Sequence, residues 1–226
     1  MGDSDLISVR EAAERLGLTP VAVRRQISAG SLPATKRGRD WWIDRRRVER
    51  RARQEIPKGR PLSPPLAWSV LLAASGEEQA AAELAGRYRS RMRAWLAEHP
   101  LAECAPQLRA RAEVEEFDAH PAELPRILAR RDILATGASA AKQIGLVGEP
   151  DHVEIYAPKA HRPQILKEHA LRPATSGPVR VRWIGDGVWS ELPLRSREAP
   201  RAAVLVDLLE SDDPRARREA ARALTA

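Results

Sequence analysis

The sequence predicts an α+β fold made of more than one domain. Three observations indicate it: two short amphipathic segments followed by a basic hairpin within 6–53, a proline-rich stretch at 56–65, and alternating, strand-like segments beyond residue 133. A chain of 226 residues is long enough for two or three domains. We therefore expect an N-terminal domain at 1–55, a linker at 56–65 and a C-terminal domain at 66–226.

A first helix is expected directly after Ser8. Glu11 stands three residues beyond this serine, which is the spacing of a capping box that satisfies free N–H groups at a helix start. Gly17 can end the helix because glycine tolerates a positive φ. The apolar residues between them fall on one helix face: Val9, Ala12, Ala13 and Leu16.

A second helix follows after a tight turn. Thr19 is placed to cap it, and Pro20 occupies the first turn, where a missing N–H has no cost. Val23 and Ile27 are four residues apart and face inward together. Gly30 is the expected end of the helix.

The outward face of the second helix has the chemistry of a DNA-reading surface. An arginine there can make paired hydrogen bonds to guanine, and a valine can contact a thymine methyl group. Thr19 and the first backbone amides are placed to hold a phosphate. Arg24 and Arg25 taken singly fit solvated helix residues equally well. The expected nucleic-acid-binding residues of this helix are Thr19, Pro20, Val21, Arg24, Arg25 and Ser28.

A basic hairpin is expected next, with strands at 34–36 and 41–43 joined by a turn at 37–40. Period-two alternation directs Trp41 toward the core and Trp42 toward the other face, where it could contact DNA, a partner or solvent. Three cations gather at the tip, as a phosphate or minor-groove contact requires: Lys36, Arg37 and Arg39.

A basic helix completes this domain. Asp44 is placed to cap it and Val48 points inward, while the arginines along 45–53 are in part simply solvated. Two helices, a hairpin and a third helix are the parts of a winged helix-turn-helix, which predicts binding to double-stranded DNA. The charge distribution agrees with this prediction. Residues 1–56 hold 13 Lys and Arg against 8 Asp and Glu, which accounts for +5 of the net charge of +7.

Residues 7–48 resemble the excisionase-type helix-turn-helix, a relative of the MerR winged domains. The resemblance is carried by Glu11 in the first helix, by Gly30-Ser31-Leu32 after the second, and by Trp41 before Ile43 in the wing. It implies the winged fold and DNA binding, and it does not specify the DNA sequence that is bound.

The C-terminal domain is predicted to be α+β with a small sheet. Residues 66–131 are mainly helical, beginning with a helix at 66–74 that is apolar on most sides. The later elements alternate in type. We expect strands at 112–117, 152–158 and 179–184, and helices at 122–129, 163–170, 199–210 and 214–224.

Two tryptophans flank Gly185-Asp186-Gly187, which we interpret as a hairpin tip. Alternation places Trp183 in the core. Trp189, past the turn, is the candidate for a partly exposed anchor that contacts a protein partner. The alternative is that both tryptophans fill a small core.

No catalytic, cofactor-binding or metal-binding motif is complete. The single cysteine, Cys104, excludes a disulfide framework and a cysteine-rich zinc site. Asp151, Glu154 and Lys159 faintly resemble a nuclease core, but the acid and the lysine are five residues apart instead of two. We expect a protein that is not an enzyme and uses no cofactor. Without an apolar run of about 18 residues or a signal peptide, it is expected in the cytoplasm, at the nucleoid.

The part from Ile133 to Leu224 resembles the C-terminal domain of AbiEi-type antitoxins. The motifs are a Ser-Ala-Ala helix that ends in Gly-Leu within 136–146, a strand ending in Tyr-Ala-Pro, and a late Pro-to-Asp-Leu-Leu helix at 200–209. The resemblance implies a transcriptional regulator, an autorepressing antitoxin of a type IV toxin–antitoxin pair. Its implied partners are double-stranded DNA and a nucleotidyltransferase-like toxin encoded next to it. A second copy of the chain, in a homodimer, is a further candidate partner.

Two functions from other classes stay open. One is a DNA-bending recombination accessory factor of excisionase type, although such proteins are little more than the first domain. The other is a DNA-directed enzyme that uses the C-terminal domain, which the missing catalytic spacing disfavours. The neighbouring gene distinguishes these alternatives.

Overall fold

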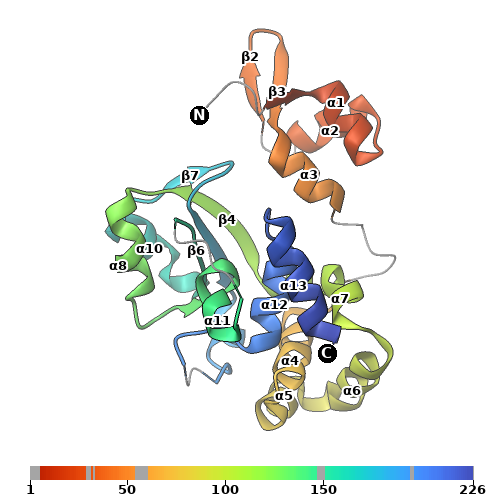
Figure 1. Ribbon diagram of the computed structural model, residues 1–226, viewed down its shortest axis with the longest axis vertical. Helices are drawn as coiled ribbons and strands as arrows, with labels where there is room; N and C mark the ends of the chain where they lie inside the picture. Colours follow the sequence, from red (N-terminus) through yellow and green to blue (C-terminus); the bar gives the residue numbers. More distant parts are fainter. Residues whose placement is uncertain are drawn as a thin grey trace. The chain divides into compact units, whose positions relative to one another are not determined.

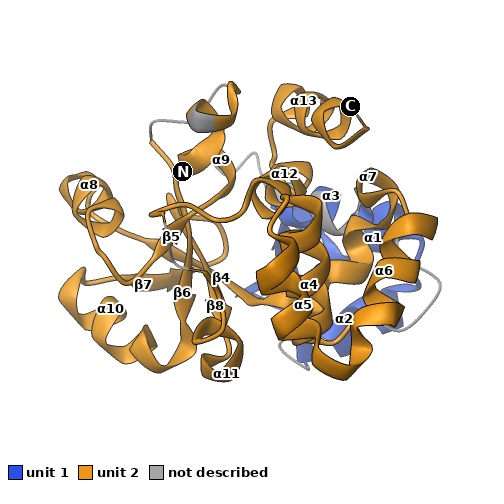
Figure 2. Ribbon diagram, turned by 90° about the horizontal axis from the view of Figure 1, so that it is seen from below, with its two compact units in different colours: residues 1–56 blue, residues 57–226 orange. Residues whose placement is uncertain are grey.

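The computed structural model describes residues 6–28, 32, 34–53, 61–146, 151–193 and 196–225. The chain forms two compact units, residues Met1–Ile56 (unit 1) and Pro57–Ala226 (unit 2), each with its own hydrophobic core (Figure 2). Helices combined with two small sheets confirm the predicted α+β class. Among the described residues, no helix has the length and apolar character needed to cross a membrane.

Within its described residues, unit 1 contains three α-helices and a three-stranded antiparallel sheet in the order β1-β3-β2. Its elements are β1 (Leu6–Ser8), α1 (Val9–Leu16), α2 (Pro20–Ser28), β2 (Thr35–Arg37), β3 (Asp40–Asp44) and α3 (Arg45–Arg53). Strand β1 was not anticipated from the sequence; it pairs Ile7 with Ile43 of β3. Both isoleucines are buried in a core that α1, α2 and α3 share.

The first part of unit 2 is helical. It contains α4 (Pro64–Ala74), α5 (Glu78–Ala85), α6 (Arg89–Glu98), α7 (Leu101–Cys104) and the 3-10 helix η3 (Ala105–Arg111). Helix α4 is apolar on most sides and is buried from Leu66 to Ala73, as its composition predicts. Its Trp68 is fully buried and donates a hydrogen bond to the carbonyl oxygen of Arg111 at 2.9 Å.

The predicted linker falls only partly within the described residues. Residues 56–60 lie outside them, and the remainder belongs to unit 2. Leu62 is buried in the core of this unit, and its N–H donates to the carbonyl oxygen of Gln107 at 3.0 Å. Pro64 and Pro65 open α4, where a missing N–H is tolerated.

The second part of unit 2 is built around a five-stranded sheet in the order β5-β6-β8-β4-β7. The strands are β4 (Glu113–Asp118), β5 (Leu134–Ala135), β6 (Val153–Pro158), β7 (Arg172–Ala174) and β8 (Val179–Ile184). The central pair, β6 and β8, is parallel. The helices are α8 (Leu124–Leu128), α9 (Gly137–Ala140), α10 (Arg162–Glu168), α11 (Asp186–Trp189), α12 (Arg201–Leu209) and α13 (Pro214–Thr225).

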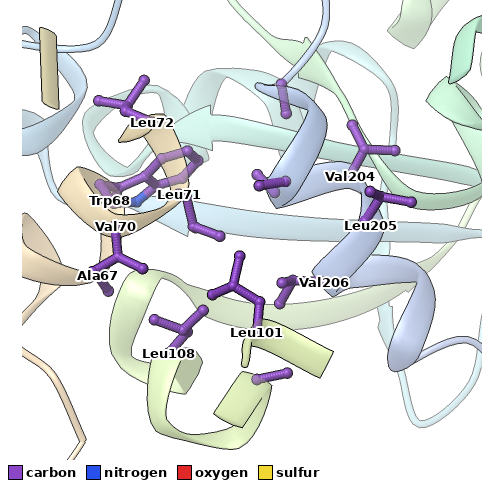
Figure 3. Packing of buried hydrophobic residues seen from close by; sticks show 14 of the residues in the cluster. Ala67, Trp68, Val70, Leu71, Leu72, Leu101, Leu108, Val204, Leu205 and Val206 are labelled. Atoms are coloured by element: carbon purple, nitrogen blue, oxygen red, sulfur yellow. The ribbon is translucent and has the colours of Figure 1, made fainter. Parts of the chain in front are cut away.

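Helices cover both faces of this sheet. Helices α8 and α10 lie on one side, and α4, α12 and their neighbours gather on the other (Figures 1 and 2). Residues Val153, Ile155 and Ala157 of β6 point into the first layer. In the second layer, Trp68 and Leu71 of α4 and Val204 and Leu205 of α12 belong to one buried cluster (Figure 3). Burial on both sides explains why all of β6 is buried.

The predicted hairpin at 185–187 is wrong. Residues Asp186–Trp189 form the short helix α11, in which the N–H of Trp189 donates to the carbonyl oxygen of Gly185 at 3.0 Å. The reason is topological, because β8 is already paired with β6 on one edge and with β4 on the other. A return strand directly after β8 would have no free edge to join.

Candidate nucleic-acid interface

Helix α1 is fixed at both ends. The N–H of Glu11 donates to Ser8 Oγ at 3.2 Å, and the N–H of Ser8 donates to Glu11 Oε2 at 2.9 Å, so the predicted capping box is present. The backbone hydrogen bond from Ser8, followed by that from its side chain, lowers the pKa of Glu11 below its ordinary value. Gly17 ends the helix at a φ of 62°, in the left-handed region that favours glycine.

Helix α2 begins as the sequence predicts. Thr19 Oγ1 accepts a hydrogen bond from the N–H of Ala22 at 3.2 Å, and Pro20 is the first helical residue. Val23 is fully buried and Ile27 is partly buried against the same core, which holds one face of α2 against the domain. The expected end of the helix at Gly30 lies outside the described residues.

The opposite face of α2 is open to solvent. Val21 exposes 72 % of its surface, which is unusual for an apolar side chain. Within the part of the chain that the structure describes, Arg24 and Arg25 make no hydrogen bond or ion pair. We use the name recognition face for these exposed side chains of α2: Pro20, Val21, Arg24, Arg25 and Ser28.

The hairpin of β2 and β3 has the geometry of a wing. Gly38, with a φ of 63°, stands in the turn between Arg37 and Asp40, which are paired across the two strands. All three tip cations predicted from the sequence, Lys36, Arg37 and Arg39, are exposed; we call them the wing-tip cations. The ammonium group of Lys36 lies 5.9 Å from the ring centroid of Trp41.

The two tryptophans of the wing are both partly buried. Trp41 packs against the core of unit 1, as predicted. Trp42 lies on the other face of β3, opposite Thr35 of β2 and Ser8 of β1. After β3, Asp44 Oδ1 accepts a hydrogen bond from the N–H of Arg47 at 3.0 Å, which confirms the predicted cap of α3. Unit 1 thus presents one apolar–cationic helix face and one cationic loop.

Unit 2 contains a set of buried charges that the sequence did not reveal. We call it the buried charge network: Arg111, Tyr156, Arg182, Asp207 and Glu210. Asp207 is fully buried and Arg111 and Arg182 are almost so. The guanidinium Nη2 of Arg111 lies 2.5 Å from Asp207 Oδ1 and 2.7 Å from Glu210 Oε1. Tyr156 donates to Asp207 at 2.9 Å, and Arg182 Nη1 lies 2.8 Å from Glu210 Oε2.

A cross-strand ladder of charges extends this network. Arg180 of β8 is in register with Glu116 of β4 and with Glu154 of β6. Its guanidinium lies 3.0 Å from a carboxylate oxygen of each. Burial raises the pKa of Glu154, and the arginines oppose this only in part. The sequence features that could have indicated the pair of Asp207 and Arg182 are a lone aspartate within the apolar helix 201–209 and arginines that alternate along β8.

The three residues of the faint nuclease pattern do not converge: Asp151 is exposed, Glu154 is held by Arg180, and Lys159 lies 2.6 Å from Glu113. Among the described residues, no group of three or more His, Cys, Asp or Glu is placed to hold a metal ion. The residues of the faint nuclease pattern therefore do not form a cluster among the described residues.

Trp183 and Trp189 differ in their surroundings. Trp183 is buried, packs edge-on against Phe117 with ring centroids 6.5 Å apart, and donates to Glu115 Oε2 at 2.6 Å. It is a core residue, as predicted. Trp189 is partly buried against the core of unit 2 and keeps part of its surface exposed.

Comparison with known families gives two matches. A model of a helix-turn-helix domain matches residues 6–55, the range of unit 1. A second model, described as "Transcriptional regulator, AbiEi antitoxin, Type IV TA system", matches residues 85–225, which is more than half of the chain. No curated protein and no solved structure matches the chain. Both resemblances drawn from the sequence are confirmed.

Proposed function

The chain belongs to the AbiEi family of transcriptional regulators, the antitoxins of type IV toxin–antitoxin systems, and from this premise we propose that it represses its own promoter. In this proposal, unit 1 reads double-stranded DNA and unit 2 serves assembly with protein partners. The protein acts at the nucleoid, where its operator lies, and it catalyses no reaction.

The recognition face is the observation that supports DNA reading most directly. The guanidinium groups of Arg24 and Arg25 have no partner among the described residues, and they lie on the same helix face as the exposed Val21. The opposite face of α2 packs against the core of unit 1 and holds the helix in place. Arginine can bind guanine O6 and N7 with two hydrogen bonds, and valine can contact the methyl group of thymine. The hydroxyl of Thr19 and the N–H of Val21 are placed for a phosphate at the groove edge, because Pro20 has no N–H and the N–H of Ala22 donates to Thr19. We assign base reading to Arg24 and Arg25.

The wing-tip cations supply affinity in this proposal. They are long, exposed and flexible side chains, which suit phosphate contacts better than base contacts. Unit 1 also has the larger surplus of positive charge, whereas residues 57–226 hold 25 Lys and Arg against 23 Asp and Glu. Balanced charge suits protein contacts better than a second track for phosphates.

The proposed protein partners are a nucleotidyltransferase-like toxin encoded beside this gene and a second copy of the chain. A homodimer would place two copies of α2 on half-sites about 34–36 Å apart, one turn of the double helix. Trp189, with part of its ring exposed, is our candidate contact for a protein partner.

The test is a reporter fused to the promoter upstream of this gene. Expression is expected to fall when the chain is supplied, and to recover when Arg24 and Arg25 are both replaced by alanine. A reporter that is unaffected by the wild-type protein contradicts the repressor role. Excision or sharp bending of DNA beside an integrase gene would instead favour the recombination factor.

The antitoxin role has its own test. Co-expression with the neighbouring gene product is expected to restore growth that the neighbour alone arrests. A matched control is the Arg24 and Arg25 double variant, which should still neutralise the toxin because its substitutions lie in unit 1. Growth arrest that persists with the wild-type chain contradicts the antitoxin role and leaves the DNA-binding proposal intact.

A further inference from the structure

Unit 2 contains a cleft of about 360 Å³ that none of the proposed functions uses. It opens where the end of α4, the junction of α6 and α7, the first half of α12 and the end of α13 meet. These segments are far apart in the sequence, so the cleft exists only in the folded unit. Its volume lies near the lower end of the range for small-molecule sites, about 300–1,000 Å³.

The cleft has an apolar part beside a polar one. Leu96, Leu101, Leu205 and Leu224 line it together with alanines of α4, α12 and α13. Leu101 and Leu205 also belong to the buried cluster drawn in Figure 3, which makes this wall a continuation of the core. A ligand with an apolar body would therefore bury its surface against side chains that are already held in place.

The ionisable residues described in the lining of the cleft are all basic. Among the described residues, its lining includes Arg201 and His99 and contains no acidic residue. Arg201 makes no hydrogen bond or ion pair within the described part of the chain. It stands at the first position of α12, where the helix dipole adds positive potential. An anion at this rim would meet a guanidinium group that has no competing carboxylate in the lining.

His99 is oriented before any ligand arrives. Its ring stacks on Trp95 with centroids 4.7 Å apart and an angle of 2° between the planes. Its Nδ1 lies 2.9 Å from the carbonyl oxygen of Trp95, which can only accept, so Nδ1 carries the hydrogen. The other ring nitrogen remains available for a ligand.

We propose that this cleft binds a small monoanion with an apolar body, of the medium-chain carboxylate class. The carboxylate pairs with Arg201 at the rim, and the chain lies along the leucine-lined walls. A single guanidinium can pair with one carboxylate through two parallel hydrogen bonds, which leaves no net charge at the rim. Because α12 and α13 both line the cleft, the ligand would also join these two helices. Only residues of unit 2 line this cleft.

The experiment is calorimetric titration of the full-length protein with octanoate, and with octanol as the uncharged analogue. We expect saturable binding of octanoate with one site per chain and weaker binding of octanol by about tenfold, as for the loss of a charge-assisted hydrogen bond. Arg201→Gln should weaken octanoate binding by a similar factor. The matched control Arg218→Gln, an exposed arginine of α13 outside the cleft, should leave it unchanged.

A second variant tests the position of the site. Ala223→Phe places a ring in the cleft and should abolish octanoate binding while Arg201 remains. If that variant fails to fold, the comparison of Arg201→Gln with Arg218→Gln still decides the question. Absence of saturable octanoate binding to the wild type overturns the proposal, and so does equal affinity for octanoate and octanol or an unchanged affinity in Arg201→Gln.

Discussion

Replacement of Asp207 by asparagine tests the role of the buried charge network. The carboxylate is fully buried and accepts hydrogen bonds from Arg111 and Thr136 at 2.5 Å and from Tyr156 at 2.9 Å, while Arg182 Nε lies 3.3 Å away. Removing one member of a buried ion pair costs about 3–5 kcal/mol, because the remaining charge is left without compensation. Glu210 still faces both arginines, so we expect the lower end of this range.

The assay is urea unfolding of the full-length protein, followed by tryptophan fluorescence and by circular dichroism. For a slope of about 1–3 kcal/mol per molar urea, a loss of about 3 kcal/mol lowers the midpoint for unit 2 by roughly 1–3 M. Asp118→Asn is the matched control, because this carboxylate is exposed at the end of β4 and should contribute less than about 0.5 kcal/mol. Equal midpoints for the two variants would refute the reasoning.

Three further outcomes are expected. Replacing the wing-tip cations by alanine should reduce the slope of log K for DNA binding against log salt concentration by about 0.9 for each phosphate that the wing no longer neutralises. An unchanged slope would show that the wing does not contact the DNA. Burial alone would raise the pKa of Glu210, but Arg111 and Arg182 hold it well below its usual range. Its contribution to stability is therefore complete above about pH 4.3 and disappears as the pH falls toward the folded-state pKa; urea midpoints that stay constant down to about pH 2 contradict this. Trp189→Ala should reduce self-association or toxin copurification with little change in melting temperature, whereas early melting would make the residue part of the core.

Local signals in the sequence predicted unit 1 well. The capping box at Ser8 and Glu11, the caps at Thr19 and Asp44, and the inward face of α2 depend on neighbours within four residues, and each is present in the structure. Strand β1 was not predicted because three residues are too few to show the alternation of apolar and polar side chains that marks a strand. It forms only because β3 offers a partner.

Long-range features of unit 2 could not be predicted in the same way. Arg111 and Asp207 are 96 residues apart in the sequence, so no spacing rule connects them. The Gly-Asp-Gly motif before Trp189 predicted that β8 ends there, but it did not predict that a short helix, α11, follows instead of a hairpin. Whether a hairpin can follow β8 depends on which strands already flank it, and that is a property of the whole sheet.

The central claim, that α2 reads base sequence, is tested most directly by fluorescence anisotropy with the operator and with a scrambled duplex of equal length. The wild-type protein should prefer the operator, and the Arg24 and Arg25 double alanine variant should lose about 1–3 kcal/mol of that preference for each arginine–guanine pair that is removed. Binding to the scrambled duplex should change much less. A double variant that keeps the full preference for the operator would contradict the assignment of α2 as the reading helix.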